Sequence, residues 1–367
     1  MQNQLARSIW ISTITIMIMG LVSLYSASYH NLRVSQDIFY DQLFCAAAGL
    51  LIMFLLSNFD YRRFYDIAYV FYALGILLLA LVLVVGRNIL GAKRWLEIGS
   101  FNFQPSELIK LVMILALARY FSQQRIPFFS GRHSLGIIVR DLLLPLSLMI
   151  LPMFLVFKQP DLGTTLLLFG TFTVMLFASG LELKYLFSFL GICLACLPFM
   201  WHLLKPYQKD RLLVFLNPNI DPLGAGYTII QSKIAIGSGL LLGKGWLSGT
   251  QNQLNFLPER HTDFIFSVIG EEWGLFGTLL VVVCFFTLIK SIFKIAQGTK
   301  DKFGHLMAVG IGSIFTLQVI TNIGMTLGLC PVVGLTLPFV SYGRSSFIVF
   351  VIMLGIILNL NKNRTIF

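Results

Sequence analysis

Long stretches without a charged side chain dominate this sequence. Residues 8–28, for example, contain no Asp, Glu, Lys or Arg. Of the 367 residues, 57% are apolar and 12% are charged, whereas soluble globular domains carry roughly 25% charged residues. A helix needs about 20 mostly apolar residues to cross the hydrocarbon layer, where only a backbone that satisfies its own hydrogen bonds is tolerated. The sequence therefore predicts an integral membrane protein and excludes disordered, collagen-like and disulfide-scaffold classes.

Ten stretches are predicted to be membrane-spanning helices: residues 8–28, 41–58, 65–86, 104–121, 137–157, 162–180, 183–204, 264–290, 305–329 and 343–360. The fourth and sixth are short and begin at polar helix starts, so each is expected to be tilted or partly re-entrant. The fold class is an all-α integral membrane protein, a single polytopic domain over residues 1–367. A long, partly structured extracytoplasmic loop at 205–262 separates spans seven and eight. The first stretch is interpreted as a retained helix, because no convincing small-residue cleavage site follows it.

The net charge of +11 reflects 27 Lys and Arg against 16 Asp and Glu. No basic run interleaves with aromatic residues on a polar face, so the charge does not indicate nucleic-acid binding. Short loops rich in Lys and Arg stay in the cytoplasm, whereas long translocated loops carry little weight in this rule. The short loops therefore favour both termini inside.

In this orientation the outer face is unusually rich in cations, which indicates an anionic ligand. The loop at 205–262 also carries Tyr207, Tyr227, Trp246 and an apolar run at 234–242. A loop of this length with its own apolar content usually covers a functional site. The cations have two interpretations, ordinary solvated charges or contacts to a diphosphate held at the membrane surface. They are Lys93, Arg94, Lys205, Lys209, Arg211, Lys233 and Lys244.

Ionisable residues at the lip of a span cost about 2.5–3.5 kcal/mol each on insertion scales and are therefore site hypotheses. They gather at three helix starts: Pro-Glu-Arg-His-Thr-Asp at 258–263, Gln-Pro-Ser-Glu at 104–107 with Lys110, and Lys-Gln-Pro-Asp at 158–161. All three lie at the outer surface in the predicted topology.

Asp263 has two interpretations, which are compatible. It can cap the helix that begins at Phe264, since a side-chain oxygen there satisfies free backbone amides. It can also be a carboxylate at the wet edge of an apolar cavity, where desolvation and the neighbouring Arg260 and His261 change its pKa in opposite directions. In that case it is a candidate base for a sugar hydroxyl.

The other acidic residues favour structural roles. Glu107 and Lys110 are spaced to meet on one helix face, which favours a buried ion pair over direct chemistry. Asp161 before Leu-Gly-Thr is interpreted as a cap in preference to a catalytic group. Glu271 and Glu272 lie among glycines, a pattern typical of a close helix-packing seam.

No His, Cys or carboxylate pattern has metal-ligand spacing, and no nucleotide loop or serine nucleophile elbow occurs. A divalent cation is left open as an assisting cofactor, and no other cofactor is indicated. The residues alone thus predict a membrane protein with an outward-facing site for an amphipathic anionic substrate.

Eight motifs take this interpretation further. They are Gly-Ala-Lys-Arg-Trp-Leu at 91–96, Phe-Gln-Pro-Ser-Glu-Leu-Ile-Lys at 103–110, Lys-Gln-Pro-Asp-Leu-Gly-Thr at 158–164, Asp-Pro-Leu-Gly-Ala-Gly-Tyr at 221–227, Gln-Ser-Lys-Ile-Ala-Ile-Gly-Ser-Gly at 231–239, Gly-Trp-Leu-Ser-Gly-Thr-Gln at 245–251, Leu-Pro-Glu-Arg-His-Thr-Asp-Phe-Ile-Phe at 257–266 and Leu-Pro-Phe-Val-Ser-Tyr-Gly at 337–343. In order and spacing the chain resembles the SEDS family (shape, elongation, division and sporulation). Its motifs are more similar to the elongation branch than to the division branch.

The resemblance implies a ten-helix peptidoglycan glycosyltransferase that polymerises lipid II at the outer face of the bacterial cytoplasmic membrane during cell elongation and rod-shape maintenance. It also implies a class B penicillin-binding transpeptidase and the elongation machinery as partners. The family's catalytic aspartate matches Asp263. Where the family has Ser-Tyr-Gly-Gly-Ser, this chain has Arg344 in place of the second glycine. Arg344 resists backbone conformations that glycine permits, so the resemblance does not fix the loop geometry there.

The implied reaction is a displacement at the anomeric carbon of a diphosphate-linked sugar, in which Asp263 accepts the proton of the attacking 4-hydroxyl and outer cations stabilise the departing diphosphate. A diphosphate leaves as an anion, so no second carboxyl group is required. The alternatives are a lipid II flippase or transporter and a non-catalytic scaffold that activates the transpeptidase. The candidate substrate-binding residues are Lys93, Arg94, Glu107, Lys110, Asp161, Lys205, Arg211, Lys233, Lys244, Glu259, Arg260, His261, Ser341 and Arg344.

Overall fold

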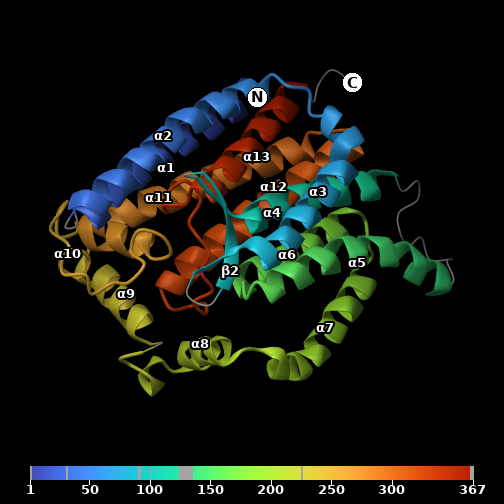
Figure 1. Ribbon diagram of the computed structural model, residues 1–367. Helices are drawn as coiled ribbons and strands as arrows, with labels where there is room; N and C mark the ends of the chain where they lie inside the picture. Colours follow the sequence, from blue (N-terminus) through green and yellow to red (C-terminus); the bar gives the residue numbers. More distant parts are fainter. Residues whose placement is uncertain are drawn as a thin grey trace.

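The computed structural model describes residues 2–29, 32–89, 92–99, 101–123, 135–224 and 226–363 (Figure 1). Ten long helices in these ranges each overlap one predicted span. They are α1 (Gln2–Ser28), α2 (Leu32–Ser57), α3 (Arg63–Val85), α4 (Pro105–Gln123), α5 (Leu135–Lys158), α6 (Leu162–Ala178), α7 (Leu183–Leu203), α11 (Ile265–Gln297), α12 (Lys302–Thr326) and α13 (Arg344–Asn363). Two ends differ clearly from the prediction, since α2 begins at Leu32 instead of 41 and α11 continues to Gln297 instead of 290. A helix does not have to stop where its apolar residues stop, because water can solvate the polar turns that follow.

Six of the described helices are long and apolar enough to cross a membrane: α1, the part of α2 from Asp37, α3, α11, α12 and α13. Shorter apolar segments lie in α5, α6 and α7, at Leu143–Lys158, Leu162–Ala178 and Leu183–Cys196. The helix at the fourth predicted span, α4, is not among these helices. It carries the charged residues Glu107, Lys110 and Arg119 and is buried along most of its length.

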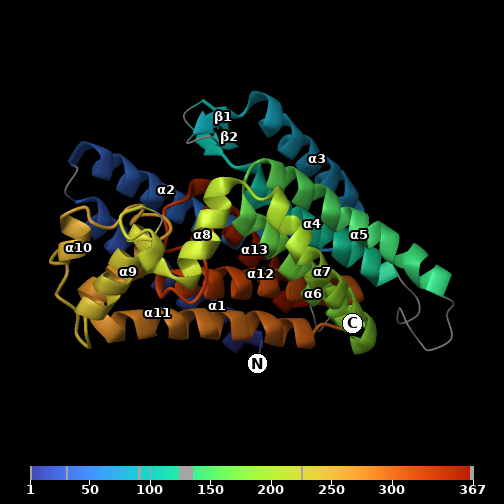
Figure 2. The same ribbon diagram turned by 90° about the horizontal axis from the view of Figure 1, so that it is seen from below.

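The centre of the bundle is formed by α12, α13 and α4. In the most apolar 18-residue stretch of each helix, 83% of α13 and 72% of α12 are buried inside the molecule, whereas only 28% of α2 and 28% of α3 are buried. Figure 2 shows α12 between α11 on one side and α3, α4 and α5 on the other. The outer helices expose apolar side chains, such as Phe44 (75%) on α2 and Val84 (75%) on α3. A surface of this kind suits lipid as its solvent.

The fold is almost entirely helical, as predicted, but the prediction did not include a small antiparallel sheet that follows α3. It comprises β1 (Arg87–Ile89), β2 (Ala92–Ile98) and β3 (Phe101–Phe103), in the order β1-β2-β3. Leu96 pairs with Phe103 across β2 and β3, and Gly99 between these strands has φ +62, a conformation that glycine adopts without strain. The strands are too short for an apolar-stretch prediction to detect. In Figure 2 the sheet lies at the edge of the bundle opposite α11, and Arg94 belongs to its strand β2.

The connection between α7 and α11 is partly structured, with α8 (Pro206–Leu216), the 3₁₀ turn η1 (Pro218–Ile220), α9 (Tyr227–Ser238) and α10 (Thr250–Gln253). It lies along one side of the bundle (Figure 1). Its segment at 240–245 pairs with a break in α11 at Gly274, where φ is 61° and ψ is −152°. Lys244 N donates to Glu271 O (2.9 Å), and Leu275 N donates to Leu240 O (2.9 Å). These bonds replace the intrahelical partners that the break removes.

Candidate active site

Asp263 lies between the turn at 258–262 and the start of α11, and it does not cap the helix. The cap position is Phe264, which makes no side-chain capping bond. Instead, the carbonyl of Glu259 accepts hydrogen bonds from the amides of Thr262 and Phe264, both at 3.2 Å. The capping interpretation of Asp263 is therefore wrong: the backbone turn occupies that place. Asp263 as a whole residue is half-buried, and its carboxylate forms no hydrogen bond with the described residues.

The surroundings of Asp263 make it an unusually strong base for an aspartate. Burial is the main cause that raises its pKa to about 6; the negative charges of Glu259 and Asp161 raise the pKa further, while Arg211 and Arg94 lower it. At neutral pH such a group is ionised, yet it holds a proton more readily than an ordinary aspartate does. Burial also lowers the pKa of His261, which favours the neutral imidazole.

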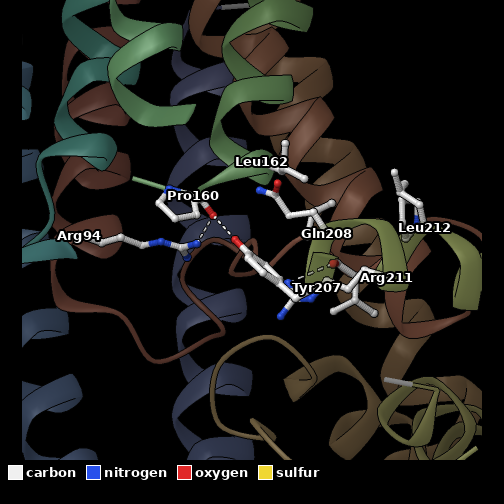
Figure 3. Close-up of a pocket in the computed structure, with 10 residues that line it drawn as sticks. Arg94, Pro160, Leu162, Tyr207, Gln208, Arg211 and Leu212 are labelled. Atoms are coloured by element: carbon white, nitrogen blue, oxygen red, sulfur yellow. Dashed lines mark hydrogen bonds between the residues drawn. The ribbon is translucent and has the colours of Figure 1, made fainter. Parts of the chain in front are cut away.

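Arg94 and Arg211 reach this region from elements far apart in the sequence. Arg94 on β2 donates to the carbonyl of Gln159 (Nε to O, 3.0 Å) and to that of Pro160. Arg211 on α8 donates to the carbonyl of Val332 (3.2 Å). Figure 3 shows Arg94 and the Tyr207 hydroxyl converging on the Pro160 carbonyl. A small, partly open pocket of about 30 Å³ lies between these segments.

The segment between α12 and α13 forms the wall behind Asp263. It contains no helix or strand at 330–337, yet Leu335 and Leu337 are buried. Asn322 on α12 donates through Nδ2 to the carbonyls of both Leu335 (2.7 Å) and Asp263 (3.0 Å). One amide side chain therefore fixes the wall and the backbone carbonyl of Asp263 to the same helix.

Glu107 and Lys110 form the predicted ion pair. Lys110 Nζ lies 2.8 Å from both carboxylate oxygens of Glu107 and 3.0 Å from Gln318 Oε1. Lys110 is 0% exposed. Gln318 Nε2 in turn donates to the carbonyl of Thr336 (2.8 Å), so the pair supports the wall through Gln318. The isolated amides Gln318 and Asn322 were missed in the sequence, where nothing separates them from other polar residues of an apolar helix.

Asp161 caps α6, as predicted. Its carboxylate accepts from Thr164 N and from Thr164 Oγ1, each at 3.0 Å. The side chain is buried, and its charge contributes to the raised pKa of Asp263.

Three further candidates hold the turn at 258–263 in place. Arg260 Nε donates to the carbonyl of Ala27 (2.6 Å), and Ser341 Oγ donates to that of Thr262 (2.6 Å). The carbonyl of His261 accepts from Tyr342 N (2.9 Å). These contacts run to α1 and to the segment before α13.

The remaining candidate cations are not brought to Asp263. Lys244 pairs with Glu271 (2.8 Å), and Lys233 on α9 packs against Gly328 after α12. Lys93 and Lys205 are exposed. Within the described residues, no three His, Cys, Asp or Glu side chains are grouped to hold a metal ion.

Arg344 does not distort the backbone where it replaces the family's glycine. It is the first residue of α13 and is helical, and neither it nor Gly343 has a positive φ. Its Nη1 lies 3.3 Å from Asp41 Oδ2 on α2. The loop geometry that the sequence left open is therefore a helix start, which any side chain can occupy.

Comparison with known proteins agrees with this architecture. The sequence profile of FtsW, RodA and SpoVE, described as a cell cycle protein, matches residues 6–366. The peptidoglycan glycosyltransferase MrdB of Escherichia coli K12 is 43% identical over 319 residues, which cover 87% of this chain and 84% of the relative. The stage V sporulation protein E of Bacillus subtilis is 36% identical over 363 residues, with 96% and 95% covered.

Two solved structures have the same fold. One comes from work titled "Structural coordination of polymerization and crosslinking by a peptidoglycan synthase complex", with TM-score 0.81, 34% identity and 97% of each chain covered. The other is the rod shape determining protein RodA of Thermus thermophilus, with TM-score 0.70, 31% identity, and 97% of this chain and 96% of that chain covered. The chain is a multi-pass membrane protein that belongs to the FtsW/RodA/SpoVE family, the SEDS family to which its motifs pointed.

Proposed function

We propose that this chain is a peptidoglycan glycosyltransferase that polymerises lipid II into glycan strands at the outer face of the cytoplasmic membrane, in cell elongation. The names of its relatives support the activity. The observation that carries the proposal is Asp263. Its carboxylate has a pKa raised to about 6, has no hydrogen-bond donor among the described residues, and lies within the electrostatic influence of Arg94 and Arg211.

The chemistry follows from these charges. The 4-hydroxyl oxygen of the acceptor sugar attacks the anomeric carbon of the donor, the bond to the diphosphate breaks, and the hydroxyl proton passes to Asp263. The negative charge of the departing diphosphate grows during this step, and Arg94 and Arg211 lie where they can stabilise it. Both guanidinium groups already donate to backbone carbonyls, so they are held in place before substrate arrives.

The proposed topology has ten membrane crossings, both termini in the cytoplasm and the 205–262 connection outside. This topology puts α8, Arg94 and Asp263 on the outer side of the membrane, where the peptidoglycan of the cell wall is assembled. A class B penicillin-binding transpeptidase is the proposed partner, and the polymerization and crosslinking named for the related synthase complex support this choice.

The test is polymerisation by the purified chain with its transpeptidase partner and lipid II. We expect glycan strands from the wild type and none above background from Asp263→Asn. Asp66→Asn is the matched control, because Asp66 lies in the first turn of α3, at the end away from β1, and we expect full activity from it. Polymer from the Asp263 variant would remove the base assignment. Lipid movement across vesicles without polymer would favour a flippase instead.

A further inference from the structure

The segment at 341–344, which ends on the first residue of α13, is tied to α2 by an ion pair. The ion pair between Arg344 and Asp41 is partly buried, with side chains 19% and 43% exposed. The Tyr342 hydroxyl donates a hydrogen bond to the same oxygen, Asp41 Oδ2, at a distance of 3.4 Å. One carboxylate on α2 thus binds two residues of this segment.

The same segment holds the backbone that leads into Asp263. Tyr342 N donates to the carbonyl of His261 (2.9 Å), and Ser341 Oγ donates to the carbonyl of Thr262 (2.6 Å). Two consecutive residues of the segment therefore fix the two peptide carbonyls that precede the carboxylate.

A second contact from α2 acts on the same residues. Gln42, which is buried next to Asp41, donates through Nε2 to the carbonyl of Ser341 (3.4 Å). The contacts form one continuous path from α2 through 341–344 to 261–262.

We propose that the Asp41–Arg344 ion pair positions the Asp263 carboxylate by fixing the 341–344 segment against α2. This inference rests on the proposed function of Asp263. Arg344 acts through Tyr342 and Ser341 and does not contact the substrate. An error of about 1 Å in the placement of a reacting group can lower a rate by about 100-fold, so a partly exposed ion pair that limits this movement affects the rate more than the stability.

A direct role for Arg344 in diphosphate binding makes different predictions. If Arg344 contacted the diphosphate, Asp41→Asn would remove a carboxylate that competes for the guanidinium and would leave substrate affinity unchanged or higher. If the pair positions Asp263, Asp41→Asn and Arg344→Gln remove the same contact and have the same effect on the rate.

The experiment measures kcat and KM for lipid II polymerisation by the chain in complex with its transpeptidase. The variants are Asp41→Asn, Arg344→Gln, the two combined, and the exchange Asp41→Arg with Arg344→Asp. We expect each single change to lower kcat about tenfold while KM changes less than about twofold. The combined variant should be no slower than either single variant, and the exchange should recover most of the lost rate. Lys184→Gln is the matched control, since it removes a cation paired with Glu182 in the short α6–α7 connection, and we expect wild-type rates from it.

Three outcomes overturn the inference: wild-type kcat in Asp41→Asn, a loss confined to KM in Arg344→Gln, or additive losses in the combined variant. If the single variants do not fold, the exchange variant and Tyr342→Phe test the proposal. We expect kcat of each within about threefold of the wild type, because both keep an ion pair between positions 41 and 344 and both lose the hydrogen bond of the Tyr342 hydroxyl. Failure of the proposed function is distinct, because a wild type without polymerase activity refutes that function, whereas an active wild type with an equally active Asp41→Asn refutes only the positioning role.

Discussion

Asp161 and Asp263 both precede a helix that opens in a polar motif, yet the structure uses them in opposite ways. Asp161 is buried, and its two oxygens accept hydrogen bonds from the amide and hydroxyl of Thr164. Asp263 makes no capping bond, and its pKa is raised. A carboxylate whose oxygens are occupied by its own helix stabilises the fold. One that lacks donors remains available to accept a proton.

The largest expected effect comes from replacing each of these two carboxylates by an amide. Asp263→Asn removes the base and is expected to lower kcat by about 10²- to 10⁴-fold, the usual contribution of general base catalysis. Asp161→Asn keeps an oxygen that can cap α6 and is expected to lower kcat by less than about tenfold. The measurement is the rate of glycan synthesis by each purified variant with the transpeptidase. Equal losses from the two variants would contradict the distinction between them.

A third helix start, that of α4, extends the comparison to a carboxylate held by a cation. Lys110→Met leaves Glu107 buried without its partner and is expected to reduce the free energy of unfolding by about 3–5 kcal/mol. The double variant with Glu107→Leu replaces both charges and is expected to regain much of that loss. Thermal unfolding in detergent measures both variants. A Lys110→Met protein as stable as the wild type would show that the pair does not support the wall behind Asp263.

The sequence predicted the helices well, because each is marked by its own apolar residues. It also predicted the Glu107–Lys110 pair and the Asp161 cap, since both depend on residues three positions apart. Helical geometry alone brings such residues together. Local contacts of this kind do not require knowledge of the fold.

The sequence could not predict contacts made between distant segments. Asp161 and Asp263 have similar local patterns, and only the turn centred on Glu259 removes the cap from Asp263. The approach of Arg94 and Arg211 depends on a short sheet and on α8, which apolar stretches do not reveal. Glu259 and Phe339 have φ values of +49° and +65°, which non-glycine residues adopt when the surrounding structure imposes them.

The direction in which stability changes with pH gives a further test of the contrast between Asp161 and Asp263. The pKa of Asp263 rises from 3.8 when solvated to about 6 in the folded protein. The folded state therefore binds more protons between these values, and this carboxyl destabilises the fold as pH rises through about 6. Asp263→Asn is expected to raise the free energy of unfolding at pH 8 by on the order of 1–3 kcal/mol, with little difference at pH 4. Thermal unfolding at both pH values measures the change.

Activity should follow the opposite course. The wild-type rate is expected to fall as pH drops below about 6, because protonated Asp263 cannot accept the sugar proton. A rate that stays constant from pH 8 to pH 5 would show that this carboxylate does not titrate in the reaction.

The smallest expected effect comes from removing one of the hydrogen-bond donors of Asp161, which makes this carboxylate more like that of Asp263. Thr164→Val removes the hydroxyl donor to Asp161 Oδ2 and keeps the amide donor to Oδ1. The loss of one hydrogen bond to a buried carboxylate is expected to cost about 1–3 kcal/mol of stability, with kcat within about twofold of the wild type because Asp161 does not accept the reacting proton. Thr171→Val is the matched control, since the Thr171 hydroxyl donates to the carbonyl of Leu167 within α6 and, among the described residues, to no carboxylate. If Thr164→Val lowered kcat by much more than about twofold, the Asp161 carboxylate would have to act on the substrate directly. The contrast between the two helix starts would then no longer hold.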